Sequence, residues 1–185
     1  WYQITQNDFS KNYGRQLCKK YNDSPYQLLK CIYPEYEWLF WKFSRGPHKY
    51  GWDNKENQLK YMAWLGEQLG FRTMDDWYKV TKNDFNENDG SGLISKYNSS
   101  PYQLLISVFP EHNWLFWKFG QAPSGVWKSR ENQLKYMTWL GETLGYTTNE
   151  DWYKITVNIF KKNYGGGGLL YQYYNGSPYQ LLTSI

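Results

Sequence analysis

The chain carries the same unusual aromatic segment twice, and this duplication restricts the folds open to it. The text EWLFWKF begins at Glu37 and NWLFWKF at Asn113, while ENQLKYM begins at Glu56 and again at Glu131. Segments so rich in Trp, Phe and Tyr do not recur by chance. Repeated blocks are typical of architectures in which each unit buries its apolar face against a neighbour. We therefore expect a tandem-repeat protein.

A Trp-Tyr pair marks the period of the repeat. Trp1, Trp77 and Trp152 each open the same text, which gives units of about 75 residues. This framing predicts repeat unit one at 1–76, repeat unit two at 77–151 and a partial repeat unit three at 152–185. A framing offset from this one, in which the ENQLKYM helix and the following Trp-Tyr segment form the compact piece, stays open. Because the sequence starts without Met and stops inside a repeat, we expect a fragment or a processed or partly observed chain, and a longer repeat array stays open.

Most patterns within a repeat unit indicate helices. The text from Thr5 to Asp8 fits a capping box in which Asp replaces the usual Glu, and Ser24-Pro25 fits an N-cap followed by Pro in the first helical position. WLFWKF predicts a short helix or an irregular segment, with a buried strand as the alternative. These signals predict an all-α fold of tandem helical repeats, with mostly short helices around one long helix per unit.

The long helix is expected from about Asp53 to Leu69. One row of side chains at helical spacing consists of Leu59, Met62, Leu65 and Leu69. A second row beside it consists of Tyr61, Trp64 and Gln68. So wide an apolar face suits a helix that packs on two neighbours, and the first row is predicted to lie in the core.

Residues suited to catalysis or metal binding are few. Cys18, Cys31, His48 and His112 do not supply the roughly four ligands of a zinc site at a suitable spacing. The two cysteines are interpreted as small buried apolar residues in a reducing compartment, and the two histidines as surface residues. The Gly165 to Gly168 run lacks the Lys-Ser/Thr of a phosphate-binding loop. We expect no enzyme activity, no cofactor, no metal and no small-molecule substrate.

The bulk composition narrows the classes of partner. The net charge of +4 neither requires nor excludes a polyanion. Eleven Trp and nineteen Tyr exceed what the core of such a chain needs, so some rings are expected at interfaces or on a binding surface. No apolar run approaches the ~18 residues of a membrane span, and an intracellular location is expected, with nucleus and organelle not distinguished.

The start of the long helix is the predicted binding site. Asn and Gln can contact adenine through two hydrogen bonds, Lys can pair with phosphate, and a Trp just before the helix can stack on a base. The predicted nucleic-acid-binding residues are Lys42, Trp52, Lys55, Asn57, Gln58, Lys60, Lys118, Trp127, Lys128, Arg130, Asn132, Gln133 and Lys135. The leading hypothesis is a non-enzymatic nucleic-acid-binding repeat protein, with DNA favoured over RNA.

Two other functions remain open. The chain can be a structural scaffold, or a subunit of a larger protein assembly, that docks through exposed aromatic rings. Carbohydrate binding on aromatic platforms is a third alternative. Rings grouped with Lys60, Arg130 and Lys135 on one face would favour nucleic acid, whereas rings beside apolar patches with acidic rims would favour a protein partner.

The repeated motifs also carry a resemblance. Through WLFWKF, ENQLKYMxWLGExLG, DWYKIT, GGGGLL and SPYQLL the chain resembles a family of tandem Trp/Tyr-rich repeats found in eukaryotic and large-virus proteins. The resemblance covers the whole chain and implies a repeat architecture. It implies no particular activity and no site residues.

Overall fold

The computed structural model describes residues 1–43, 51–120 and 122–185. Every regular element in these ranges is a helix, so the predicted all-α class is confirmed. Contacts along the chain divide it into two compact parts, Trp1–Phe109 and Pro110–Ile185, here called domain 1 and domain 2. His48, interpreted above as a surface residue, lies outside the described residues.

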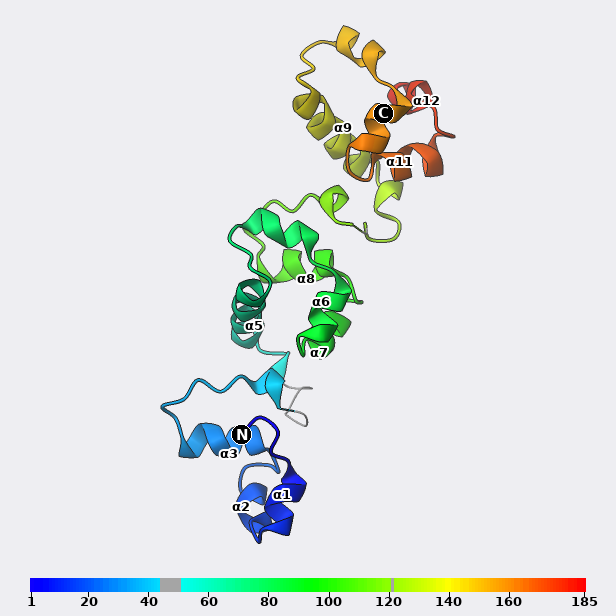
Figure 1. Cartoon of the computed structure of the whole chain (residues 1–185). Coiled ribbons are helices and arrows are strands. Elements are labelled where there is room, and N and C mark those ends of the chain that lie inside the picture. The colour runs from blue at the N-terminus through cyan, green and yellow to red at the C-terminus, as the bar shows by residue number, and fades with distance from the viewer. Residues whose placement is uncertain (44–50, 121) are drawn as a thin grey trace. The chain divides into compact units, whose positions relative to one another are not determined.

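The helices of each domain are short except for one. Domain 1 contains α1 (Gln6–Lys11), α2 (Arg15–Lys19), α3 (Pro25–Ile32), the 3-10 turn η1 (Phe40–Lys42), α5 (Lys55–Gln68), the 3-10 helix η2 (Met74–Lys79), α6 (Lys82–Glu87), α7 (Ser91–Lys96) and α8 (Pro101–Val108) (Figure 1). Domain 2 contains the 3-10 turns η3 (Phe116–Lys118) and η4 (Val126–Lys128), α9 (Arg130–Leu144), the 3-10 helix η5 (Asn149–Lys154), α10 (Val157–Lys162), α11 (Gly166–Tyr173) and α12 (Pro178–Ser184).

The predicted helix starts are present. The Asp8 carboxylate accepts from the backbone N–H of Thr5 at 2.8 Å, and the Thr5 hydroxyl accepts from the Asp8 N–H at 3.3 Å. Thr81 and Asp84 form the same reciprocal pair at the start of α6. At α3 the cap is one-way: the Ser24 hydroxyl accepts from the Gln27 backbone N–H at 3.3 Å, and Pro25 stands in the first helical position. Because these bonds satisfy backbone donors that the first turn leaves open, they fix where the short helices begin.

The WLFWKF segment forms a single 3-10 turn in each copy rather than a strand. Phe40–Lys42 and Phe116–Lys118 have the same length and the same extended flanking residues. Phe40 and Trp41 are buried in domain 1, as Phe116 and Trp117 are in domain 2. The prediction of a short helix is confirmed, and the strand alternative is wrong within the described residues.

The buried face of the long helix differs from the predicted one. Leu59 is 40% exposed, so its assignment to the core is wrong. The buried side chains of α5 are Gln58, Tyr61, Met62 and Leu65. These also follow helical spacing, but the row is shifted by one position from the predicted start. Because Gln58 is polar, a search for apolar residues at helical spacing leaves it out and therefore misses the buried row.

In each domain a buried tyrosine of the long helix is surrounded by other aromatic rings. The Tyr61 ring centroid lies 5.2 Å from that of Trp41, 5.1 Å from that of Trp52 and 6.3 Å from that of Phe85. In domain 2, Tyr136 has a corresponding set of aromatic neighbours. Burial raises the pKa of both phenols above the ordinary value for tyrosine. The neutral phenol therefore belongs to the folded state.

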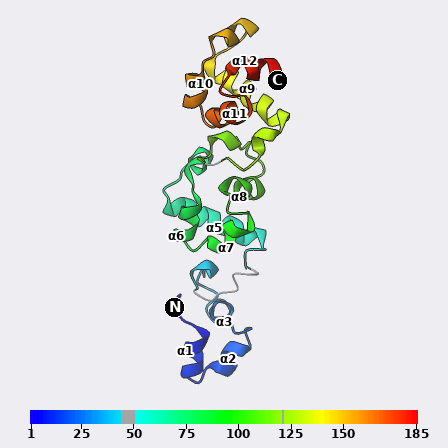
Figure 2. The same cartoon turned by 90° about the vertical axis from the view of Figure 1, so that its right-hand side faces the viewer.

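Pairs of short helices close over this tyrosine. Figure 1 and Figure 2 show α6 beside α7, and these two helices pack against each other, as do α10 and α11. The Tyr61 hydroxyl donates to the Asn88 carbonyl at 3.0 Å, at the end of α6. A Cβ on Gly90 would lie 2.0 Å from the Tyr61 hydroxyl oxygen, so only glycine fits at the start of α7.

Two further surface features follow from the structure. Cys18 is buried as expected, but Cys31 is exposed, so its interpretation as a buried apolar residue is wrong. Cys31 lies near the end of α3. None of the helices within the described ranges has the length and apolar character needed to cross a bilayer.

Candidate functional site

The two tryptophans predicted to stack on bases belong to the core. Trp52 is 1% exposed and Trp127 is 5% exposed. Their ring centroids lie 4.6 Å from Phe40 and 4.8 Å from Phe116, respectively. Stacking on a base requires an open ring face, which neither side chain has. The burial of Trp52 and Trp127 does not support their predicted role in base stacking, which stays a prediction.

The two glutamines predicted to read bases are also buried. The Gln58 side-chain amide donates to the Trp52 carbonyl at 2.7 Å and accepts from the Tyr97 hydroxyl at 2.9 Å. Gln133 makes the matching bonds to the Trp127 carbonyl at 2.7 Å and the Tyr174 hydroxyl at 2.6 Å. These amides satisfy buried polar groups, which does not support the prediction that Gln58 and Gln133 contact bases.

The neighbouring asparagines fix the turn before the helix. Asn57 donates from its side-chain amide to the Gly51 carbonyl, and Asn132 donates to the Val126 carbonyl, each at 2.9 Å. Both side chains are half-buried. With these amides bound to the protein's own backbone, the Asn-Gln pair links the long helix to the turn that precedes it. A base-reading role is not what the geometry of this pair supports.

Lysines one turn into each long helix are paired with glutamates. Lys60 Nζ lies 3.0 Å from Glu56 Oε1, and Lys135 Nζ lies 2.7 Å from Glu131 Oε1. The hydrogen bond to Glu56 raises the pKa of Lys60, and the bond to Lys135 lowers the pKa of Glu131. All four side chains are largely exposed, so the pairs are open to exchange with other ions.

The first cation of each long helix binds the end of a SPYQLL helix. Lys55 donates to the Ser107 carbonyl near the end of α8, and Arg130 donates to the Ile185 carbonyl after α12 at 2.8 Å. A cation at a helix C-terminus is favoured by the helix dipole and by the open carbonyls there. These two predicted contacts to phosphate therefore have a structural use.

The remaining predicted cations differ in their surroundings. Lys42 Nζ lies 4.8 Å from the centroid of the Trp64 ring, which is a cation–π distance. Lys118, at the corresponding place in the other copy, is half-buried, and Lys128 is exposed. Of the predicted site, the structure thus leaves lysines at the surface but no base-reading side chain beside them.

A cleft in domain 1 was not predicted. It has a volume of about 1030 Å³ and lies between α3, the segment 34–41 and α5. Its lining includes the predicted residues Asn57 and Lys60. The other lining residues are Tyr26, Gln27, Lys30, Pro34, Glu35, Tyr36, Glu37, Trp38, Leu39, Phe40, Trp41, Gly51, Asn54, Glu56, Ala63, Trp64 and Glu67.

The charges around the cleft are mainly negative. Four carboxylates line it, from Glu35, Glu37, Glu56 and Glu67, against the amines of Lys30 and Lys60. Lys60 is already paired with Glu56. Glu35 and Glu37 line the cleft and are exposed to solvent. A concave surface with this excess of carboxylates repels phosphate and attracts cations.

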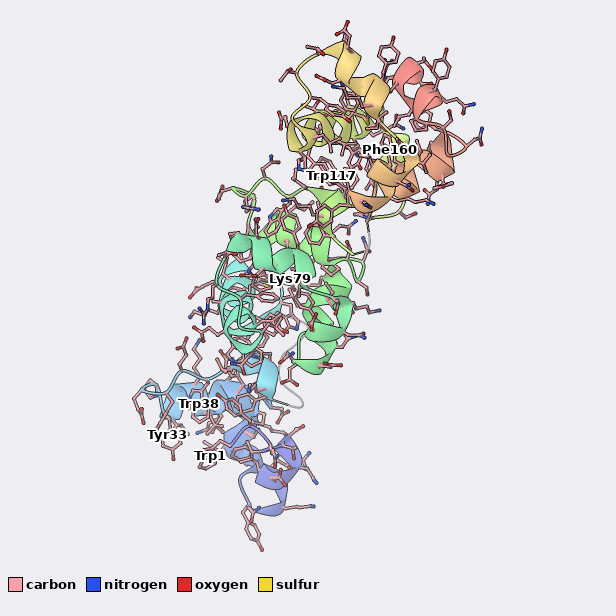
Figure 3. The ribbon with its side chains drawn as sticks, turned by 45° about the horizontal axis from the view of Figure 1, so that its top comes forward. Trp1, Tyr33, Trp38, Lys79, Trp117 and Phe160 are labelled. Atoms are coloured by element: carbon pink, nitrogen blue, oxygen red, sulfur yellow. The ribbon has the colours of Figure 1, made fainter. Side chains whose placement is uncertain are left out.

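Aromatic rings continue from the cleft onto the surface of domain 1. The ring centroids of Tyr36 and Trp38 lie 5.8 Å apart, and those of Tyr33 and Tyr36 lie 6.5 Å apart. Figure 3 shows Tyr33, Trp38 and Trp1 close to one another. Tyr36 is 62% exposed, while the indole N–H of Trp38 donates to the Tyr33 carbonyl at 3.0 Å and holds the ring in place. The rings form a fixed apolar surface beside the carboxylates.

One sequence feature could have identified this cleft. Acidic and aromatic residues alternate in Glu35-Tyr36-Glu37-Trp38, directly after Pro34. In the structure Pro34 and Glu35 form a turn and Tyr36 lies at a bend, with the Tyr36 backbone N–H donating to the Tyr33 carbonyl at 3.3 Å. Both carboxylates and both rings line the cleft. The second copy reads Glu111-His112-Asn113-Trp114 there and lacks one carboxylate and the tyrosine.

No family model, curated protein or solved structure matches this chain. Among the described residues, no group of three or more His, Cys, Asp and Glu side chains is placed to hold a metal ion. The function is therefore argued from the chemistry of the cleft.

Proposed function

We propose that this chain is a non-enzymatic protein-interaction subunit, and that the cleft of domain 1 binds a polypeptide segment carrying Lys or Arg beside an apolar side chain. The observation that carries the proposal is the lining of the cleft, in which four carboxylates accompany aromatic rings from Tyr26 to Trp64. Interfaces that bind protein segments are enriched in Tyr and Trp, and complementary charge adds specificity.

The roles within the cleft divide by chemistry. Glu35 and Glu37 would pair with the cation of the bound segment. Tyr36 and Trp38 would contact its apolar side chain, and a guanidinium lying over either ring would gain a cation–π contact. Because the Trp38 ring is held by its bond to the Tyr33 carbonyl, it loses little conformational freedom on binding.

Nucleic-acid binding, the leading hypothesis from the sequence, has less support. Trp52, Trp127, Gln58 and Gln133 are interior, and the cleft beside the start of α5 is acidic. The surface lysines alone would give at most salt-sensitive contacts to phosphate. This hypothesis remains a prediction, tested as the second arm of the experiment below.

Selection of random peptides displayed on phage against the full chain tests the proposal. We expect enriched peptides to share a Lys or Arg next to an aromatic or aliphatic residue. A synthetic copy of one such peptide should bind at least about tenfold more weakly to Tyr36→Ser and to Glu37→Lys, since both changes remove side chains that line the cleft. Tyr36 and Glu37 are exposed, so neither change should disturb the fold.

Matched controls come from domain 2. Tyr153→Ser replaces a tyrosine that is 91% exposed, and Glu150→Lys replaces an exposed glutamate. Both should leave peptide binding unchanged. Peptides without a basic residue, or binding that all four variants retain, would contradict the proposal.

The second arm is a gel-shift salt titration with duplex and single-stranded DNA and RNA. We expect no specific complex. A complex that weakens steeply with salt and disappears in the Lys60→Glu/Lys135→Glu double variant would favour nucleic acid instead.

A further inference from the structure

Three copies of one sequence block differ in how they are covered. Phe9 and Leu17 in the first copy correspond to Phe85 and Leu93 in the second and to Phe160 and Leu169 in the third. The two phenylalanines and two leucines of the later copies are all fully buried. In the first copy, Leu17 is 42% exposed and Phe9 is only partly buried. The same sequence block thus has an open face in one copy.

In the second copy, the long helix α5, which precedes the block in the chain, covers this face. Tyr61 of α5 stacks over Phe85, and its hydroxyl both donates to the Asn88 carbonyl and lies where a Cβ on Gly90 would stand. Gln58, one turn earlier on α5, accepts from the Tyr97 hydroxyl. These contacts attach α6 and α7 to the long helix.

The third copy is covered in the same way in domain 2. Tyr136 of α9 lies 6.4 Å from Phe160 between ring centroids and donates to the Asn163 carbonyl at 2.9 Å. A Cβ on Gly166 would again lie 2.0 Å from the tyrosine hydroxyl oxygen. Two independent instances therefore show what sits on this face.

The first copy keeps the surface that receives such a helix. α1 and α2 pack on each other side by side (Figure 1, Figure 2), and the three atoms nearest to a Cβ on Gly14 would all belong to Phe9, at 3.2 to 3.6 Å. Among the described residues, no tyrosine hydroxyl lies within 3.2 Å of that Cβ position, whereas one lies at 2.0 Å for Gly90 and for Gly166. The carbonyl of Asn12 stands at the position that accepts from tyrosine in the other copies.

We propose that this open face, formed by Phe9, Gly14 and Leu17, binds the aromatic helix of a further repeat unit with the sequence type of α5. The tyrosine of that helix would stack on Phe9 and donate to the Asn12 carbonyl. Its aliphatic side chains would cover Leu17. The chain is thereby a segment of an assembly that continues through repeat-to-repeat packing, independently of what the acidic cleft binds.

The first copy differs from the later copies at one position that affects how a helix can pack on its open face. Gln16 stands where the others have Gly92 and Gly168, and a Cβ on Gly92 would lie 2.7 Å from the Trp52 indole nitrogen. Gln16 is exposed and flexible, so its side chain can turn aside. In the second copy, the Trp52 indole N–H that faces Gly92 is buried without an acceptor among the described residues. The Gln16 amide oxygen can supply such an acceptor.

A second molecule of this chain is a poorer occupant. Its α5 and α9 already cover α6–α7 and α10–α11 through the same faces. To lend either helix, the second molecule would have to expose its own Phe85 or Phe160. A further unit, whose long helix has no such partner yet, loses nothing on binding.

The test extends the full chain with a copy of its own residues 34–76 joined ahead of Trp1, which reproduces the spacing found before Trp77. Hydrogen–deuterium exchange is then followed in α1 and α2, with α6 and α7 of the same molecule as the internal reference. We expect exchange in α1 and α2 to slow by about tenfold or more towards that of the reference, because covered helices open less often.

Variants separate the proposed contact from a general effect of the extension. Leu17→Asp, or Tyr→Ala at the tyrosine of the added helix, should remove the protection. Ile106→Asp, at a side chain of similar exposure on α8, should leave it in place. Unchanged exchange in the extended chain, or protection that survives Leu17→Asp, would overturn the proposal. Dimers of the unextended chain that Leu17→Asp abolishes would also overturn it, in favour of a second molecule.

Discussion

Replacing Gln58 by leucine tests most sharply whether the polar start of the long helix is structural. In this structure the Gln58 side chain is 4% exposed and makes two short hydrogen bonds, to the Trp52 carbonyl and from the Tyr97 hydroxyl. Leucine has a similar size and removes both bonds. The Trp52 carbonyl then loses the side-chain donor that satisfies it, whereas the Tyr97 hydroxyl keeps a contact with the Ser107 hydroxyl at 3.2 Å.

The expected loss in the free energy of unfolding follows from the two hydrogen-bond partners of Gln58. A buried acceptor left unsatisfied costs about 1–3 kcal/mol, and a bond whose donor finds another partner costs about 0.5–1.5 kcal/mol. Some of this is offset by the burial of an apolar side chain in place of an amide. We therefore expect Gln58→Leu to lower the free energy of unfolding by about 2–3 kcal/mol.

Urea denaturation followed by far-ultraviolet circular dichroism measures this loss. The matched control is Gln68→Leu, which makes the same change at an exposed position of the same helix. It should alter the free energy of unfolding by no more than about 0.5 kcal/mol. Equal midpoints for Gln58→Leu, Gln68→Leu and the unchanged chain would refute the structural role and restore Gln58 as a candidate for base contact.

Three further predictions concern packing and ionisation. Gly90→Ala should destabilise by about 1–3 kcal/mol in the same assay, because its Cβ would meet the Tyr61 hydroxyl, whereas Gly120→Ala, with nothing within 4 Å, should not. Hydrogen bonds, chiefly from Lys79, hold the pKa of Asp76 below its ordinary value. The Asp76 carboxylate therefore stabilises the fold above pH ~4, and this contribution to stability is lost on acidification. Asp76→Asn should flatten the fall of Tm below pH ~4. Burial raises the pKa of Tyr61 and Tyr136. The stability that the two neutral phenols give the fold is therefore kept below pH ~10 and lost at higher pH. In a phenolate absorbance titration, Tyr61 and Tyr136 should ionise only as the chain unfolds at alkaline pH.

The sequence was sufficient where structure is decided locally. The Thr5–Asp8 capping box and the Ser24-Pro25 start depend on residues within four positions of each other, and both occur as expected. Gly70 and Gly145 end the long helices with φ of 71°, which glycine adopts without strain.

Prediction failed where tertiary contacts decide which face of a helix is buried. Leu59 is apolar and correctly spaced, yet it faces solvent, while Gln58 beside it lies in the core. What makes Gln58 an interior residue is the hydroxyl of Tyr97, which directly follows the separate helix α7. Single-sequence periodicity contains no information about such a partner. The burial of Trp52 was missed for the same reason, since its neighbour Phe40 comes from a separate turn.

The cleft was out of reach for a related reason. Its walls come from α3, segment 34–41 and α5, which are brought together only by the fold. The alternation in Glu35-Tyr36-Glu37-Trp38 was its one local sign. A search restricted to basic residues at helix starts could not find an acidic surface.

The most direct test of the central claim is an NMR titration of the indole N–H signals with a peptide selected as described above. Trp38 and Trp64 line the cleft, whereas Trp139 and Trp152 belong to domain 2. We predict that the signals of Trp38 and Trp64 shift in proportion to bound peptide and that those of Trp139 and Trp152 do not. Unshifted cleft signals at saturating peptide, or cleft signals that respond only to duplex DNA, would contradict the account.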